Sequence, residues 1–138
     1  MKRVSLLIAL LILVLSLTVV LAGCGSKEPA GPKNLEEYVA SDENLRNEIQ
    51  TIADSNGLDI AVVGNVMTFT YKYTDEFDDA MKAQAGPLIE QALSSYADTF
   101  KGLAKDMEEQ TGLSGISIKV QYLDAKDSEL YSTEYKAE

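Results

Sequence analysis

Hydrophobic positions divide the chain into an apolar run near the amino terminus and a longer part in which apolar residues recur periodically. Residues 4–20 contain no charged side chain. From residue 34 onward, apolar residues recur every three to four positions, as in amphipathic helices, or every second position, as in half-buried strands. This pattern predicts an export segment at residues 1–23, a flexible linker at 24–33 and one folded domain at 34–138.

Two helices are predicted at the start of the domain. The side chain of Asn34 can accept hydrogen bonds from the free backbone N–H groups of a first helical turn, and Glu37 stands at the capping-box position. Asp42 offers a second cap, and Gly57 provides a left-handed stop. Residues 34–56 therefore predict a short helix followed by a longer one.

A β-hairpin is predicted at residues 58–73, where the apolar period changes to two. If Gly64 and Asn65 form a two-residue loop, Val63 pairs with Val66 and the large apolar residues of both strands share one face. The other face then carries a small patch that consists of Ala61, Val63, Val66 and Thr68.

The second half of the domain predicts a long helix and another hairpin. The helix starts at Asp75, with a kink or break at Gly86-Pro87, because proline loses an amide hydrogen bond and clashes with the preceding turn. Thr111-Gly112 ends it. Strands at residues 116–122 and 130–136 follow, joined by a turn at 124–127; Tyr131, Thr133 and Tyr135 are expected to point inward.

The order of these elements is helix, hairpin, long helix, hairpin. Each hairpin has one apolar face and each helix one apolar stripe. Such elements bury their apolar sides against one another, so we expect an α+β fold with a four-stranded antiparallel sheet and helices packed on one face.

Charge and composition restrict the function. All 22 acidic residues but only ten of the 12 basic ones remain once Lys2 and Arg3 leave with the export segment. Such an acidic domain repels nucleic acid and anionic lipid headgroups. The chain has no histidine, the residue most used for acid–base chemistry near neutral pH and the commonest metal ligand. We therefore expect a protein that is not an enzyme, with no catalytic residue, cofactor or metal.

Two groups of residues have a functional as well as a structural interpretation. The acidic cluster Asp75, Glu76, Asp78 and Asp79 lacks the ligand spacing of a calcium loop and suits the start of a helix. Seven tyrosines and three phenylalanines could line a binding groove, but most fall on inward positions and favour core packing. A hydrolase or ligand-binding protein that works through carboxylates or tyrosines remains the alternative.

The export segment ends in Leu21-Ala22-Gly23-Cys24, and Cys24 is the only cysteine. This stretch resembles the lipobox of bacterial lipoproteins. The resemblance implies cleavage between Gly23 and Cys24 and diacylglycerol on the Cys24 sulfur, so that acyl chains such as palmitate hold the protein on the membrane. In the other reading, the apolar segment is retained as a transmembrane anchor.

Four further stretches carry a second resemblance: Leu35-Glu36-Glu37-Tyr38, residues 67–73, Tyr122-Leu123-Asp124 and Leu130-Tyr131-Ser132. With the lipobox, they resemble an uncharacterised domain family of small lipoproteins from clostridial Gram-positive bacteria. Family members often have Asn-Gly-like chemistry at the last turn, where this chain has Asp127. The family is of unknown function, so the resemblance carries no catalytic residue over to this chain.

These observations predict a lipoprotein anchored at the outer face of the cell membrane, with a non-catalytic binding or envelope-accessory role. The membrane partner is engaged through Cys24, an envelope protein is a possible further partner, and nucleic acid is excluded by charge. A partner would dock on the uncovered sheet face or on an edge strand.

Overall fold

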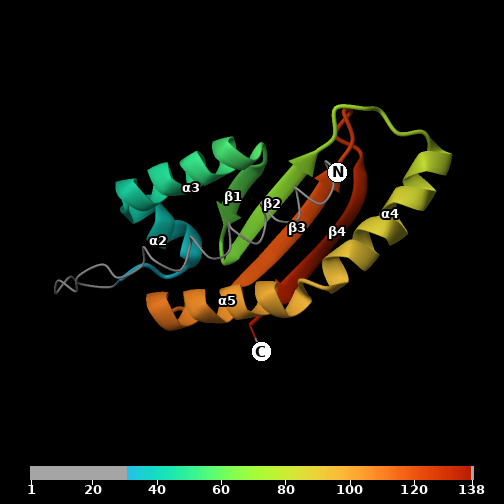
Figure 1. Cartoon of the computed structure of the whole chain (residues 1–138). Helices are drawn as coiled ribbons and strands as arrows, with labels where there is room; N and C mark the ends of the chain where they lie inside the picture. Colours follow the sequence, from blue (N-terminus) through green and yellow to red (C-terminus); the bar gives the residue numbers. More distant parts are fainter. Residues whose placement is uncertain (1–30, 138) are drawn as a thin grey trace.

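The computed structural model describes residues 31–137, and the predicted export segment with Gly23 and Cys24 lies outside them. Four helices and four strands follow one another in this part (Figure 1). Their order is α2 (Leu35–Ser41), α3 (Glu43–Asn56), β1 (Asp59–Val63), β2 (Val66–Lys72), α4 (Asp79–Ser94), α5 (Ala97–Thr111), β3 (Ser117–Leu123) and β4 (Glu129–Lys136).

The first two helices begin and end as predicted. The Asn34 side chain accepts from the Glu37 N–H at 2.8 Å, and the Asp42 side chain accepts from the Leu45 N–H at 3.1 Å. Gly57 closes α3 with φ +63°, a left-handed conformation that costs glycine little because it has no Cβ. Glu37 accepts from the Lys33 N–H, one residue before the expected capping-box partner.

The first hairpin has the predicted register. Val63 pairs with Val66, Val62 with Met67 and Ile60 with Phe69, in antiparallel pairing around Gly64-Asn65. The alternation along β2 is complete: Met67, Phe69 and Tyr71 are buried while the residues between them are half-buried. The two-residue period of the sequence therefore correctly predicted the position of the loop and the face of the hairpin that is buried.

The sheet is mixed, so the prediction of a purely antiparallel sheet was wrong. Its strand order is β1-β2-β3-β4, and the central strands β2 and β3 run parallel, with Val66 opposite Ser117 and Lys72 opposite Leu123. Parallel neighbours need a long crossover connection, which α4 and α5 supply here. The period of a strand states which side chains face the core but not the direction of its neighbour.

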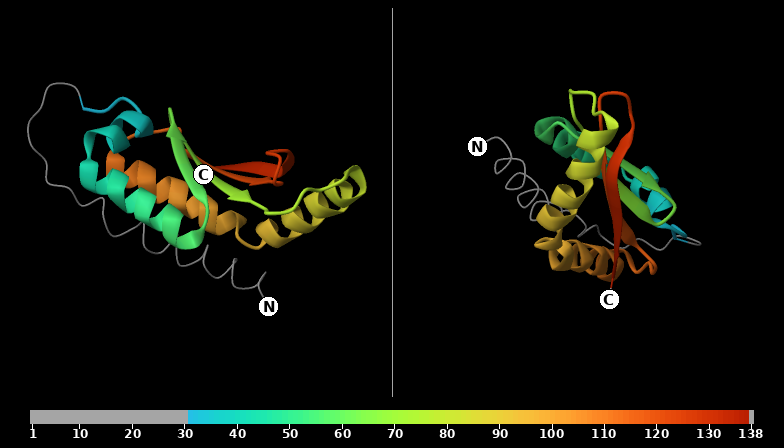
Figure 2. Two further views of the ribbon diagram at one scale, coloured as in Figure 1. Left: turned by 90° about the horizontal axis from the view of Figure 1, so that it is seen from above. Right: turned by 90° about the vertical axis from the view of Figure 1, so that its right-hand side faces the viewer.

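The long helix differs from the prediction in three places. It starts at Asp79, with Asp78 as its N-cap, and not at Asp75. It continues through Pro87 and breaks at Ser95-Tyr96, where α5 sets off in another direction (Figures 1 and 2). The apolar period is uninterrupted across this bend, since α4 contributes Ile89 and Leu93 and α5 contributes Phe100 to the same core.

The core lies between the sheet and the helices that contact it. Its most deeply buried large side chains include Phe69, Phe100, Met67, Ile118 and Val120. Burial of a large apolar side chain contributes roughly 1.5–3 kcal/mol, so these residues dominate the stability. Tyr135 is buried as predicted and stacks on Phe100 with the ring centroids 5.0 Å apart, whereas Tyr131 and Thr133 are half-buried.

A bulge in β4 was not predicted. The register with β3 shifts between Tyr122 and Leu123, which pair with Tyr131 and Glu129 and leave Leu130 between them. Leu130 is buried, and its carbonyl oxygen would lie 3.3 Å from a Cβ on Gly86. Gly86 therefore lets α4 approach the backbone of β4 closely. Within residues 31–137, no helix is both long enough and apolar enough to cross a membrane.

Candidate functional site

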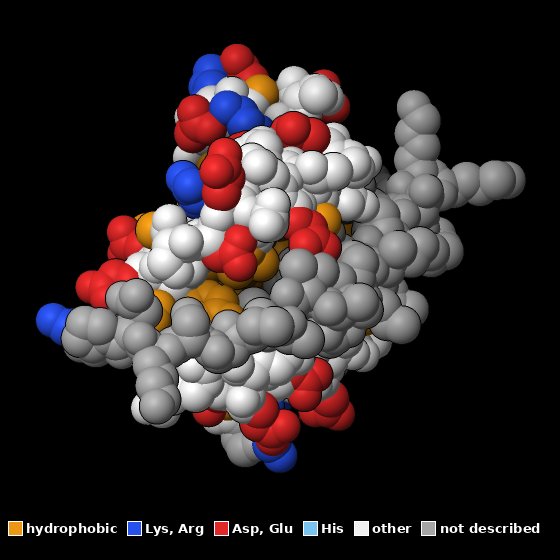
Figure 3. Space-filling view, turned by 90° about the vertical axis from the view of Figure 1, so that its left-hand side faces the viewer, with side chains coloured by type: hydrophobic (Ala, Val, Ile, Leu, Met, Phe, Trp, Pro, Cys, Tyr) orange, Lys and Arg blue, Asp and Glu red, His pale blue; other side chains and the backbone are white. Residues whose placement is uncertain are grey.

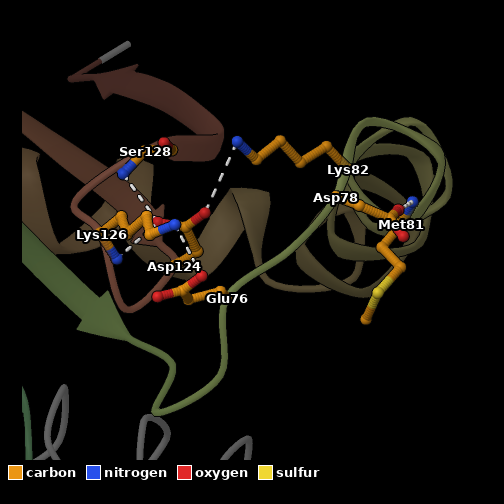
Figure 4. A network of polar contacts seen from close by, with 7 residues as sticks. All are labelled: Glu76, Asp78, Met81, Lys82, Asp124, Lys126 and Ser128. Carbon is orange, nitrogen blue, oxygen red and sulfur yellow. Dashed lines mark hydrogen bonds and ion pairs between the residues drawn. The ribbon is translucent and has the colours of Figure 1, made fainter.

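Two loops meet at the carboxyl ends of the parallel strands β2 and β3. The Tyr73 N–H donates to the Leu123 carbonyl at 2.9 Å, and the Ala125 N–H donates to the Asp75 carbonyl at 3.0 Å. Crevices at the carboxyl ends of parallel strands are common ligand sites. Side chains from both loops and from the start of α4 gather at this junction (Figure 4).

Asp124 lies at the centre of the junction and is 1% exposed. Its Oδ1 accepts from the N–H groups of Lys126 and Ser128, both at 2.9 Å. Its Oδ2 lies 3.5 Å from the Lys82 Nζ in the first turns of α4. One carboxylate thus connects the β3–β4 turn to the start of α4.

The surroundings of Asp124 favour its ionised form. Desolvation by burial raises the pKa of this carboxyl, but backbone hydrogen bonds from Ser128, Lys126 and Phe77 and the charge of Lys82 together lower it below its ordinary value. A carboxylate with a lowered pKa and occupied oxygens is unsuited to act as a general acid. The role of Asp124 is to hold the turn in place.

Two exposed ion pairs strengthen the same junction. Lys126 Nζ lies 2.7 Å from Glu76 Oε2, and this hydrogen bond raises the pKa of Lys126. Lys72 Nζ lies 2.6 Å from Asp127 Oδ1. Asp127 has φ +63°, the left-handed conformation that Asn and Gly favour at such turns. Exposed pairs of this kind contribute at most about 1 kcal/mol each.

The acidic cluster at residues 75–79 is divided between a loop and a helix start. Asp78 caps α4 by accepting from the Met81 N–H at 2.8 Å, and Asp79 occupies the first turn. Asp75 and Glu76 precede the helix, which corrects their assignment to its first turns. Across residues 31–137, no group of three or more acidic or other ligating side chains is arranged to hold a metal ion.

The aromatic residues near this junction are packed and not arranged as a groove. Tyr71 and Tyr122 stack with their ring centroids 4.9 Å apart, and Tyr73 lies against both Tyr122 and Phe77. Burial, followed by the charge of neighbouring tyrosines, raises the pKa of Tyr71 and Tyr122. Both phenols stay neutral across the physiological range. The Tyr71 hydroxyl is buried without a hydrogen-bond partner among residues 31–137.

Two shallow hollows lie on the surface, and the first of them borders the junction at Lys72. One, of about 300 Å³, is lined by the carboxyl end of α3 with Asp59, Thr70 and Lys72. The other, of about 330 Å³, lies beside the start of β3 and is lined by residues that include Glu108, Ser117, Glu134 and Lys136. In the second hollow, Glu108 accepts from the Ile116 N–H at 2.9 Å and Glu134 accepts from the Ser117 hydroxyl at 2.6 Å. One oxygen of each carboxylate is therefore already engaged.

The predicted patch of Ala61, Val63, Val66 and Thr68 is present. It lies on the sheet face opposite to the one that carries the buried side chains. Ala61 pairs with Thr68 and Val63 with Val66, so the four residues are neighbours. Val63 is 70% exposed, the highest value among the large hydrophobic side chains that the structure describes. The patch ends at β3 and β4, where Ser117, Gln121 and Ser132 hydrogen-bond to Glu134 and Glu129. The apolar part of this face is thus confined to the first hairpin.

The sequence pattern did not reveal the Asp124 junction. Asp124 was assigned only to turn chemistry, which describes its bonds to Lys126 and Ser128 but not its contact with Lys82, more than forty residues earlier in the chain. The signal that was available is an aspartate directly after a strand, followed by polar residues that form an Asx-type turn. Gly23 and Cys24 lie outside the described residues, so no contact can be assigned to them.

Comparison with known proteins gives a family but no activity. Neither the curated proteins nor the solved structures include a match to this chain. A family profile described as a domain of unknown function, DUF4854, matches residues 35–135. This range extends from the first residue of α2 to Tyr135 near the end of β4. The chain therefore belongs to the DUF4854 family.

Proposed function

We propose that this protein is a lipoprotein anchored at the outer face of the membrane of a Gram-positive, clostridial-type bacterium, with a non-catalytic binding or envelope-accessory role. The observation that carries the anchor is the stretch Leu21-Ala22-Gly23-Cys24 after an uncharged apolar run. Cys24 is the only cysteine, so an intrachain disulfide is not available to it. Two or more acyl chains, at about 0.8 kcal/mol per buried methylene, make such an anchor stable.

The proposed anchor keeps the domain near the membrane. Residues 25–33 include Pro29, Gly31 and Pro32 and precede the N-cap of α2. Fully extended, they span about 30 Å at ~3.3 Å per residue. The domain would therefore meet a partner close to the outer surface of the cell membrane.

The binding role is supported by a difference between the two faces of the sheet. In this proposal, the helices cover the face that carries Met67, Phe69 and Tyr71, and the face that carries Ala61 and Val63 stays open. Exposed apolar patches on small domains often serve as protein-binding sites. The junction at Asp124 supports a non-catalytic role because its carboxylate is already engaged by backbone N–H groups and by Lys82.

Metabolic labelling tests the anchor. Cells that express the full chain are given a radiolabelled or alkyne-modified fatty acid. The wild-type protein is expected to take up label and to lose residues 1–23, whereas Cys24→Ser is expected to accumulate as unlabelled precursor. The double variant Cys24→Ser/Ser26→Cys is the matched control, because it keeps one thiol in the chain but moves it two residues beyond the cysteine of the lipobox.

Only attachment at Cys24 accounts for label in the wild-type protein and none in either variant. Label in Cys24→Ser, or a wild-type protein that keeps its apolar segment and carries no lipid, would contradict the proposal. The second result would favour the transmembrane anchor instead.

The second candidate function is a small hydrolase or ligand-binding protein that uses carboxylates or tyrosines. The hollow lined by Glu108 and Glu134 is the observation that favours it, because paired carboxylates can cleave glycosidic bonds. Turnover of a chromogenic glycoside by the wild-type protein, lost in Glu134→Gln with the fold intact, would establish this function in place of the binding role.

A further inference from the structure

The two edges of the sheet are protected to different degrees. β4, at one edge, contains Glu129, Glu134 and Lys136, has a bulge and is contacted by α4 and α5. Charged side chains, bulges and covering helices are the devices that prevent an edge from pairing with another strand. β1, at the other edge, begins with Asp59 and is contacted by α2 and α3, but it contains no charged residue, proline or bulge between Ile60 and Val63.

The backbone of β1 is capped at both ends and open between them. In a hairpin with a two-residue loop, Val63, Ala61 and Asp59 bond to β2, so the alternate residues direct their N–H and C=O groups outward. At one end, the Leu58 N–H donates to the Ala53 carbonyl at 3.1 Å. At the other end, the Gly64 N–H donates to Glu36 Oε2 at 2.7 Å and the Gly64 carbonyl accepts from the Glu36 N–H at 2.9 Å.

Ile60 and Val62 are the two outward-directed positions between these caps. No residue of the described range 31–137 hydrogen-bonds to their backbone N–H or C=O groups outward from the sheet. Four backbone groups at this edge therefore have the spacing and direction that an added β-strand requires. Both side chains are half-buried and pack against the core, so the strand is held rigidly in an extended conformation.

The surroundings of this edge are apolar in the middle and acidic around it. Ala61 and the 70% exposed Val63 belong to β1 itself. Between residues 34 and 63, seven acidic side chains accompany a single basic one, Arg46. Figure 3 looks onto the side of the molecule on which α2 and α3 lie, and on the part that is not grey it shows apolar side chains with carboxylates above them. At one end of β1, Glu36 accepts from the Gly64 N–H. At the other end, Asp59 of β1 and Asp54 line one hollow together with Lys72. These three carboxylates form the acidic rim of the edge.

We propose that β1 is a docking edge for an extended segment of a basic partner protein, which joins the sheet beside Ile60 and Val62 as a fifth strand. Main-chain hydrogen bonds to the four open groups supply the attachment, and apolar side chains of the segment cover Ala61 and Val63. Lysine or arginine at its ends complements the acidic rim. A second copy of this chain is disfavoured as the occupant because two acidic rims would repel each other.

This inference rests on the proposed binding role but not on the lipid anchor. It names the place of binding and the chemistry of the partner. Failure of lipid labelling at Cys24 would leave it standing, and absence of binding at β1 would leave the anchor standing. The two results are therefore distinguishable.

The test uses the full-length, ¹⁵N-labelled chain in detergent micelles and a blocked peptide, Lys-Val-Thr-Val-Thr-Val-Lys, as the probe. The control peptide has glutamate at both ends in place of lysine. Amide signals of Ile60 and Val62 are expected to shift most and to become protected from exchange when the basic peptide is added. Binding is expected to weaken with added salt, because surface charges are screened.

Two variants separate the edge from the rest of the surface. Val62→Pro removes an outward N–H that no described residue uses, and proline is tolerated on an edge strand when its missing N–H faces outward. Val62→Thr is the matched control, since it keeps a β-branched side chain and the N–H. Val62→Pro is expected to weaken binding of the basic peptide by at least about tenfold, equivalent to about 1.4 kcal/mol, and Val62→Thr by much less.

Three results of the peptide experiment would overturn the proposal, and a fourth result concerns the wild-type chain alone. These are equal binding of the acidic and basic peptides, undiminished binding by a folded Val62→Pro variant, and no binding by the wild-type chain at millimolar peptide. Dimerisation of the wild-type chain that Val62→Pro abolishes would also overturn it, because the occupant of the edge would then be a second copy.

Discussion

At the scale of single residues, Asp124 is a buried carboxylate that joins two loops of the fold. It is buried, and it holds Lys126, Ser128 and Lys82 around one turn. Its pKa is lower in the folded protein than its ordinary value of 3.8. The stability that it contributes is therefore fully present above the unfolded pKa, near pH 4, and is lost as the pH falls through the lower folded pKa.

Asp124→Asn is expected to lower the melting temperature by several degrees at pH 7. Asparagine keeps one oxygen for the backbone N–H groups but loses the charge that faces Lys82. The difference between wild type and variant should shrink as the pH is lowered from 5 towards 2, as followed by thermal unfolding at each pH. Asp127→Asn is the control, because Asp127 is exposed and asparagine also tolerates its left-handed conformation. A difference that is constant over this pH range would show that the charge is not what matters.

Local chemistry explains which residue roles could be predicted. Asn34, Asp42 and Gly57 act within four residues of their partners, so short sequence patterns were sufficient to identify them. Asp124 and Lys82 are brought together only by the crossover between β2 and β3. No local pattern encodes such a contact.

At the scale of elements, α4 contains an unusual proline in its interior. Pro87 has no N–H to donate to the carbonyl one turn earlier, yet α4 continues to Ser94. The helix is kept in place by Ile89 and Leu93, which are buried in the core. Tertiary packing therefore outweighs the local preference for a break.

Pro87→Ala is expected to raise the free energy of unfolding by about 1–3 kcal/mol, because it restores a helical hydrogen bond and a good helix former. Pro87 is exposed, so no core packing is lost. Urea unfolding followed by circular dichroism measures the change. Gln84→Ala, at an exposed position one turn earlier, is the control and should change stability by no more than about 0.5 kcal/mol. A less stable Pro87→Ala variant would mean that proline shapes α4 against the sheet.

The apolar period identified the helical segments but not their boundaries. Residues 88–107 keep one helical period, and nothing in this period marks the bend at Ser95-Tyr96. The bend arises because α4 packs along β4 while α5 packs against both β3 and β4. Similarly, acidic residues at 75–79 suit a helix start, but only Asp78 and Asp79 provide one.

At the scale of the whole molecule, helices and strands share one core, so the domain should unfold as a unit. Buried residues of α2, α3, α4 and α5 belong to the same cluster as those of β2 and β3. Small domains with a single core usually unfold without populated intermediates.

Urea unfolding followed by helical circular dichroism and by tyrosine fluorescence should therefore give coincident curves. The chain has seven tyrosines and no tryptophan, and Tyr71 and Tyr122 report on the centre of the sheet. A fluorescence transition that is displaced from the helical transition would contradict the single domain and would assign α4 or α2 to a separate unit.

The fold class and the first hairpin were predictable from periodicity, whereas the direction of β3 was not. Alternation requires that Ile118, Val120 and Tyr122 face the core, and both a parallel and an antiparallel β3 satisfy this requirement. The choice depends on where the α4–α5 crossover returns the chain. A candidate binding face was likewise predictable from Ala61 and Val63, but the open backbone groups of Ile60 and Val62 required the structure.

The parallel pairing of β2 with β3 has a consequence for the order of synthesis. Val66 pairs with Ser117, which is synthesised some fifty residues later. Until β3 has been made, β2 lacks its parallel neighbour in the sheet. A nascent chain that ends at α5 therefore still exposes the apolar face of the first hairpin, which makes it prone to aggregation. Quality-control proteases and chaperones would meet it in that form, and a premature stop codon anywhere before β3 should give no folded fragment at all.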